Sequence, residues 1–209
     1  MAEAEESLGK VCDIEDICSG REWFELSPDC RSLANIHITM GRERRECAAV
    51  INDTDIRQLI EEHSKPEDPV IYTDGSVRRG ERSGWGFVVY SRNKRVHSMS
   101  GTIERTTSSM KMEIEAVTRA LGWLQDARPR TTHLIIVTDS QSILRRVEKR
   151  LLRSEWMNPM QHTSLRAITW IFCPGHSGVK GNEEADRLAG SAVVDGQVKF
   201  DKEVLKTLA

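Results

Sequence analysis

Two aspartates stand directly after apolar segments of this sequence. Asp74 follows residues 70–73 and Asp139 follows residues 133–138, and both segments contain the β-branched residues that favour strands. Side chains at the carboxyl ends of strands in an α/β sheet converge on the crevice where ligands bind. The two aspartates are therefore predicted to lie together at one end of a sheet.

Two further acids have apolar neighbours within predicted helices. Glu113 lies one turn into the first of these helices, and Asp186 lies in the last. Singly, each of the four acids has a structural explanation as a turn cap, a helix cap or a solvated side chain. Carboxylates that converge beside apolar residues are costly to bury, but a divalent cation offsets that cost, and carboxylate oxygens suit Mg²⁺. Together, the four acids predict a metal site.

The elements that position these acids are expected in the order βββαβαβα. Three strands at residues 70–74, 84–90 and 95–101 follow one another so closely that they should pair antiparallel. Then come a helix from Ser108 or Ser109 to residue 127, a strand at 133–138, a helix to about residue 153, a short helix at 159–167, a strand at 167–172, a loop at 173–180 and a closing helix at 182–194. The predicted fold is α/β, a mixed five-stranded sheet with helices on both faces.

Three regions are expected along the chain. Residues 1–68 form an acidic N-terminal extension or linker, partly helical or disordered, with a short helix that begins at Asp53 or Thr54. A polar break with two prolines at residues 65–69 marks the start of the main domain, 69–194. Residues 195–209 form a tail that is either a short helix or disordered.

Composition favours an intracellular protein, cytoplasmic or nuclear. The sequence has 38% apolar residues, which suffices for a core, and no apolar run near the length that spans a membrane. The N-terminal residues are acidic, which argues against a targeting peptide. The five cysteines are odd in number and form no C-x-x-C pair, so free thiols in a reducing compartment are expected.

The small net charge of −2 hides an uneven distribution. Residues 1–69 carry 8 lysines and arginines against 17 acids, whereas residues 70–194 carry 19 against 12. The second segment is basic although it contains the four predicted metal-binding acids. Such a surface suits a polyanion such as nucleic acid, the alternative being an ordinary solvated surface.

Four motifs occur in a fixed order on this predicted frame. They are Thr-Asp-Gly-Ser at 73–76, Met-Glu-Ile-Glu-Ala at 112–116, Thr-Asp-Ser at 138–140, and Gly-His-Ser-Gly at 175–178 followed by Glu-Ala-Asp at 184–186. With these motifs, residues 69–194 resemble a type 1 ribonuclease H domain and are most similar to those attached to the reverse transcriptases of non-LTR retrotransposons. The resemblance implies that Asp74, Glu113, Asp139 and Asp186 are catalytic and bind metal, and that His176 is catalytic.

The resemblance also implies an activity. The expected reaction is endonucleolytic hydrolysis of the RNA strand of an RNA–DNA hybrid by a two-metal mechanism, with two Mg²⁺ ions for which Mn²⁺ can substitute. The expected partners are the hybrid and, if the chain belongs to a longer polyprotein, a reverse transcriptase; no membrane is expected. The candidate substrate-binding residues are Gly75, Ser76, Thr107, Ser108, Ser109 and Asn182.

Some positions depart from the family pattern. Ser109 stands where the family has an asparagine ahead of the catalytic glutamate, and the interval from Asp139 to Asp186 is short for the extra basic helix of bacterial cellular enzymes. A basic run from Arg145 to Arg153 is a partial replacement for that helix. Glu115 points away from Glu113 on a helix and is not counted as a ligand. The alternatives are a DNA-acting nuclease on the same fold and a non-catalytic nucleic-acid-binding module.

Overall fold

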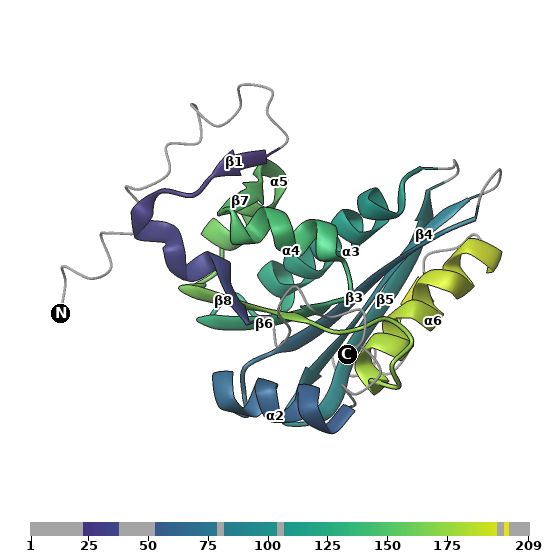
Figure 1. Ribbon diagram of the computed structural model, residues 1–209, viewed down its shortest axis with the longest axis horizontal. Coiled ribbons are helices and arrows are strands. Elements are labelled where there is room, and N and C mark those ends of the chain that lie inside the picture. Colours follow the sequence, from purple (N-terminus) through teal and green to yellow (C-terminus); the bar gives the residue numbers. More distant parts are fainter. Residues whose placement is uncertain (1–22, 38–52, 79–81, 104–106, 196–198, 201–209) are drawn as a thin grey trace, which may run out of the picture.

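A sheet of seven strands forms the centre of the protein (Figure 1). This computed structural model describes residues 23–37, 53–78, 82–103, 107–195 and 199–200. The strands are β1 Trp23–Glu25, β2 Asn35–His37, β3 Val70–Val77, β4 Ser83–Ser91, β5 Lys94–Ile103, β6 His133–Thr138, β7 Leu151–Arg153, β8 Ala167–Phe172 and β9 Lys199–Phe200. The helices are η1 Pro28–Ala34, α2 Asp53–His63, α3 Ser109–Ala127, α4 Gln141–Glu148, α5 Ser154–Gln161 and α6 Lys180–Asp195.

The predicted mixed sheet and its element order are confirmed. Strands β3, β4 and β5 pair antiparallel, and β6 and β8 are added in parallel on the other side of β3. The sheet is wider than the five strands expected, because β2 extends it beside β8 and β9 extends it beside β5, giving the order β2-β8-β6-β3-β4-β5-β9. Both additions are very short strands, which carry little signal in the sequence.

Helices cover both faces of the sheet, as β6 illustrates. Leu134 and Ile136 of β6 belong to one hydrophobic core, whereas Ile135 and Val137 belong to a second core on the opposite face. Helices α3, α4 and α5 cover the first face, and α2 and α6 cover the second (Figure 1). Burial on both faces explains why this strand is apolar throughout.

The segment between β6 and β8 differs from the prediction. The helix expected to continue to about residue 153 ends at Glu148, and Arg150 takes a positive φ of 60° before β7. The short helix expected at 159–167 is α5, which begins at Ser154 and buries Trp156, Met157 and Met160. Strand β7 interrupts the helix because it pairs with β1, a distant partner that local periodicity does not reveal.

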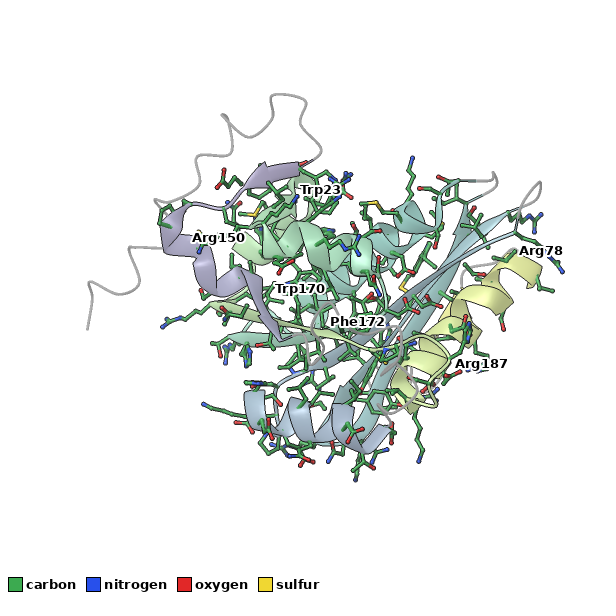
Figure 2. The ribbon with its side chains drawn as sticks, in the orientation of Figure 1. Trp23, Arg78, Arg150, Trp170, Phe172 and Arg187 are labelled. Carbon is green, nitrogen blue, oxygen red and sulfur yellow. The ribbon has the colours of Figure 1, made fainter. Side chains whose placement is uncertain are left out.

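The described parts of residues 1–68 pack onto the two cores. Leu26 and Leu33 are buried beneath the first face, and the indole N–H of Trp170 donates to the Leu33 carbonyl at 3.2 Å. Trp23 lies on the same side, where the guanidinium groups of Arg146 and Arg153 lie 4.8 and 5.4 Å from its ring centroid (Figure 2). Two arginines of the basic run therefore contact an N-terminal tryptophan.

Helix α2 begins at Asp53, which confirms the helix predicted there. The expectations for residues 1–22, 38–52 and 201–209 lie outside the described residues. Within the part of the chain that the structure describes, no helix has the length and apolar character needed to cross a bilayer. Cys30 and Cys173 are free and buried.

Candidate active site

Strand register brings Asp74 and Asp139 together. Strands β3 and β6 are parallel, and their last paired residues are Thr73 and Thr138. Each threonine is fully buried and is followed at once by its aspartate, so both carboxylates leave the sheet where this pairing ends. Strand β3 itself continues to Val77, beyond the end predicted at Asp74, because its last residues pair with β4. Asp74 is only 6% exposed, and Asp139 is half-buried. This is the convergence expected at the carboxyl ends of neighbouring parallel strands.

Gly75 allows helix α3 to approach strand β3. A Cβ atom at Gly75 would lie 2.6 Å from the backbone nitrogen of Glu113, a distance at which the helix would have to move away. The start of α3 is fixed by Ser108, whose side-chain oxygen accepts a hydrogen bond from the Lys111 N–H at 3.2 Å. The cap and the glycine together place Glu113, 5% exposed, beside Asp74.

These side chains line one cavity of about 410 Å³. Eight of the residues predicted from the sequence line it: Asp74, Gly75, Ser109, Glu113, Asp139, His176, Asn182 and Asp186. All four predicted metal-binding acids and the predicted histidine therefore share one space, although they come from three elements and two loops.

Acids that line this cavity raise one another's pKa values. Burial, and then the charge of Asp139, raises the pKa of Asp74 to about 7. Burial, followed by the charges of Asp74 and Asp139, raises the pKa of Glu113 well above its usual range. Burial and the charge of Asp186 raise the pKa of Asp139, with Asn182 and His176 acting in the opposite direction. A nearby cation would relieve this repulsion.

Asp74, Glu113 and Asp139 have the arrangement of a metal site. One oxygen from each lies within 4.8 Å of the other two. The Oε2 atom of Glu113 is buried and has no hydrogen-bond partner among the described residues. An unpartnered carboxylate oxygen in a cluster of three acids suits a hard divalent cation such as Mg²⁺. We refer to these three residues as the buried carboxylates.

His176 and Asp186 form a more exposed group in the same cavity. The His176 Nδ1 atom lies 3.7 Å from an oxygen of Asp186, and the two side chains are 82% and 41% exposed. His176 has a positive φ of 53° in the loop between β8 and α6. Glu183 of α6 accepts a hydrogen bond from the Gly178 N–H at 3.1 Å and so ties this loop to the helix. We refer to His176 and Asp186 as the exposed pair.

Asn182 links the two groups. It is 2% exposed and lies in the first turn of α6. Its side chain donates a hydrogen bond toward Asp139, whereas its Oδ1 atom is buried without a partner in the described part of the chain. Asn182 thus orients one of the buried carboxylates from the helix that carries the exposed pair's aspartate.

Three predicted substrate-binding residues lie outside the cavity lining. Ser76 is half-buried in β3 opposite Gly84, and the Thr107 N–H donates to the Ser83 hydroxyl at 3.1 Å. The side-chain oxygen of Ser108 serves as the helix cap. The lining also contains Met110, Ser140, Gln141 and Ser142, which the motifs did not single out. In the sequence, only their position close to Ser109 and Asp139 marks these residues.

Glu115 lies away from the cavity. Its Oε1 atom pairs with the Arg119 guanidinium at 2.7 Å, one turn further along α3. The helical geometry that excluded this acid from the ligand set is confirmed, because Glu113 and not Glu115 lines the cavity.

Comparison with known proteins gives consistent matches. The family model described as RNase H matches residues 66–194. A ribonuclease H of Mycolicibacterium smegmatis is 35% identical over 142 residues, which are 59% of this chain and 86% of that protein. A ribonuclease H of Nitrosococcus oceani is 32% identical over 147 residues, covering 62% and 96% of the two chains. The solved structure of LC11-RNase H1 in complex with an RNA/DNA hybrid has a TM-score of 0.51 at 22% identity, covering 61% and 97%.

Proposed function

This chain belongs to the ribonuclease H family of enzymes, and we propose that it cleaves the RNA strand of RNA–DNA hybrids as an endonuclease. The observation that carries the proposal is the single cavity lined by Asp74, Glu113, Asp139, Asp186 and His176. Four carboxylates and a histidine in one open groove suit hydrolysis of a phosphodiester by metal-assisted chemistry.

The proposed cofactor is a pair of Mg²⁺ ions, for which Mn²⁺ can substitute. The buried carboxylates would hold them, with Asp186 completing the set. When bound, such a pair supplies an activated water and offsets the charge on the departing 3′ oxygen. The arrangement of the three oxygens and the unpartnered Glu113 Oε2 atom support this assignment.

The protein's own residues hold and orient the groups that react. Gly75 contributes backbone hydrogen bonding that favours the ionised forms of Asp74 and Glu113. Asn182 orients Asp139 and keeps its carboxylate available. His176 stands in solvent beside Asp186, where an imidazole can accept a proton and pass it to water. We assign His176 to proton movement or to release of the product.

Hybrid specificity would come from groups beside the buried carboxylates. A hydroxyl of ribose needs a donor or an acceptor across the minor groove. Gly75, Ser109 and the unpartnered Oδ1 of Asn182 are next to the cavity and suit that contact. Ser76, Thr107 and Ser108 are proposed as more distant contacts, with the Thr107–Ser108 region receiving a phosphate of the DNA strand. The basic balance of residues 70–194 supports binding of a polyanion.

We also propose that the domain derives from a retroelement. The support is the motif resemblance and the short interval between Asp139 and Asp186. That interval contains α4, β7, α5 and β8, and α5 buries Trp156, Met157 and Met160 in the first core. A reverse transcriptase in the same polyprotein and an intracellular site of action, cytoplasmic or nuclear, belong to this proposal.

A cleavage assay tests the proposed function. End-labelled RNA–DNA hybrid, duplex DNA, duplex RNA and single-stranded RNA are each incubated with the full chain in Mg²⁺ or in EDTA. We expect Mg²⁺-dependent cutting of RNA in the hybrid alone. Asp74→Asn should abolish it, whereas Asp126→Asn, the same change at an exposed position near the end of α3, should not. Equal cutting of duplex DNA would favour a DNA-acting nuclease, and binding without cutting in any metal would favour a non-catalytic module.

A further inference from the structure

Helix α2 lies outside the segment that matches the family model, yet it forms part of the fold around the site. The match begins at residue 66, whereas α2 spans Asp53–His63. Ile56 and Ile60 on its inner face are 0% and 8% exposed. They belong to the second hydrophobic core, together with Val179, just before α6, and Ala185 of α6. The helix therefore shares a core with the element that carries Asp186.

The first residue of α2 contacts the first residue of α6. The Asp53 Oδ1 atom accepts a hydrogen bond from the Lys180 N–H at 3.0 Å. Amides in the first turn of a helix have no acceptor within that helix, and a carboxylate there also interacts favourably with the helix dipole. The other oxygen of Asp53 pairs with Arg57 at 2.6 Å, one turn further along α2. Asp53 thus caps α6 from a separate element.

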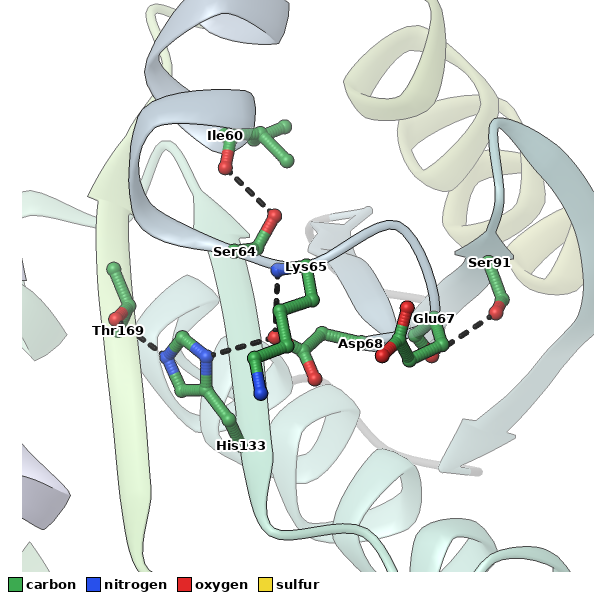
Figure 3. A network of polar contacts seen from close by, with 8 residues as sticks. All are labelled: Ile60, Ser64, Lys65, Glu67, Asp68, Ser91, His133 and Thr169. Atoms are coloured by element: carbon green, nitrogen blue, oxygen red, sulfur yellow. Dashed lines mark hydrogen bonds and ion pairs between the residues drawn. The ribbon is translucent and has the colours of Figure 1, made fainter.

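The far end of α2 is fixed to the sheet (Figure 3). The Ser64 hydroxyl donates to the Ile60 carbonyl at 2.7 Å, and the Lys65 N–H donates to Asp68 Oδ2 at 2.9 Å. The same Asp68 oxygen lies 3.0 Å from Nδ1 of His133 on β6, and Nε2 of that histidine lies 2.9 Å from the Thr169 hydroxyl on β8. These contacts attach the segment after α2 to strands β6 and β8 and do not involve α6.

The first two turns of α6 reach the active site at three places. Asn182 donates toward Asp139, Glu183 holds the loop of His176 through Gly178, and Asp186 lies beside His176. A small displacement of this end of α6 would move all three contacts together. Misplacement of reacting groups by about 1 Å can lower a rate by about 10²-fold.

We propose that Asp53 is a positioning residue, and that α2 fixes the start of α6 so that Asn182, Glu183 and Asp186 meet the active site correctly. The inference rests on the proposed function, because the affected reaction is cleavage of the hybrid. Asp53 acts through the Lys180 amide and touches neither the substrate nor the buried carboxylates. A residue that precedes the family-matched segment would therefore have a role in the reaction.

Four variants separate this role from general packing. Asp53→Ala removes the acceptor, Asp53→Asn keeps an oxygen acceptor but loses the charge, and Asp53→Glu keeps the charge but moves the acceptor by one methylene. Asp55→Ala is the matched control, because it removes an acid from the same helical turn at an exposed position. Thermal unfolding followed by circular dichroism establishes that each variant is folded.

Two measurements decide the outcome. The first is the hydrogen-exchange rate of the Lys180 amide in the metal-free protein, which is independent of activity. The second is the division between kcat and KM for hybrid cleavage. For Asp53→Ala we expect amide exchange to be faster by about tenfold, kcat to fall by about tenfold, and KM to stay unchanged. Asp53→Asn and Asp55→Ala should resemble the unmodified protein, and Asp53→Glu should resemble Asp53→Ala.

The proposal is overturned if Asp53→Ala changes neither quantity, if Asp53→Asn is as damaging as Asp53→Ala, or if Asp55→Ala has the same effect. If Asp53→Ala does not fold, Asp53→Glu and Asp53→Asn still separate acceptor position from charge. An unmodified protein that cuts no hybrid would contradict the proposed function. In that case the exchange measurement would still show whether Asp53 fixes the start of α6.

Discussion

The buried carboxylates and the exposed pair line the same cavity, but they are held in opposite ways. Asp74 and Glu113 are 6% and 5% exposed and are fixed by strand register and by a close helix–strand contact at Gly75. His176 and Asp186 are 82% and 41% exposed, and a loop held by few hydrogen bonds carries the histidine. In the proposed function, the buried carboxylates would hold metal away from solvent. The exposed pair would combine Asp186, which completes that set, with His176, which exchanges protons and product with solvent.

The largest expected effect comes from the buried carboxylates. Asp74→Asn should lower kcat for hybrid cleavage by about 10³-fold or more, because an amide cannot replace the charge that a divalent cation requires. Single-turnover cleavage of labelled hybrid measures it, with Asp126→Asn as control. Hybrid binding by mobility shift should persist. A decrease in kcat of less than tenfold would show that Asp74 is not an essential member of the buried carboxylates.

The second largest effect tests how Glu113, one of the buried carboxylates, is positioned. Gly75→Ala adds a Cβ atom that would lie 2.6 Å from Glu113 N, so α3 must move away and take its carboxylate along. We expect kcat to fall by about 10²-fold. Gly122→Ala, a change within α3 itself, is the control, because its added Cβ meets nothing within 4 Å. That variant should keep its activity and gain about 0.5–1 kcal/mol in free energy of unfolding. Equal activity in both variants would contradict the role given to Gly75.

A smaller effect is expected from the exposed pair. His176→Ala should lower kcat by about tenfold, less than a firmly positioned acid or base contributes. The measurement is steady-state cleavage of the labelled hybrid, with Asp126→Asn as the control. A loss of kcat as large as that of Asp74→Asn would show that the exposed pair contributes as much as the buried carboxylates.

The smallest effect concerns stability without metal. The raised pKa of about 7 at Asp74 means that the folded state holds its proton more tightly than the unfolded state does. This contribution to stability is complete below about pH 4 and is lost as pH rises toward 7. In EDTA, the melting temperature should therefore fall over that range. Asp74→Asn should raise it by about 4–8 °C at pH 7.5, on the order of 2 kcal/mol.

Magnesium provides the control for that measurement. Added Mg²⁺ should stabilise the unmodified protein at pH 7.5 by binding the folded state, and should stabilise Asp74→Asn less. Differential scanning calorimetry in EDTA and in Mg²⁺ gives both values. A melting temperature that is independent of pH and of Mg²⁺ would mean that the three carboxylates are not under mutual repulsion.

The core of the site could be predicted because its signals are local. Asp139 follows β6, and Asp74 lies in β3 at the point where its pairing with β6 ends. The sequence marks both strands clearly, and parallel pairing then leaves little choice about where the two carboxylates lie. The periodicity of α3 placed Glu113 toward the sheet and Glu115 away from it. For these residues, strand alternation and helical spacing were enough to predict where the side chains lie.

Other features could not be predicted because they depend on distant partners. Strand β7 exists through its pairing with β1, and β2 has only three residues, so neither has a local pattern. The helix at Asp53 was expected, but its contact with Lys180 joins residues 127 positions apart. By contrast, Ser108 caps α3, as expected for Ser108 or Ser109, because a helix cap is a local signal.

Strand β2 and helix η1 have a consequence for how the chain folds as it is made. They rest against β8, and the Ser32 hydroxyl donates to the Arg166 carbonyl across 134 positions of sequence. A ribosome adds about 5–20 residues each second, so the N-terminal segment emerges several seconds before the strand that receives it. During that interval Leu26 and Leu33 have no core to enter. The segment that contains η1 and β2 therefore completes its packing only after β8 has been made.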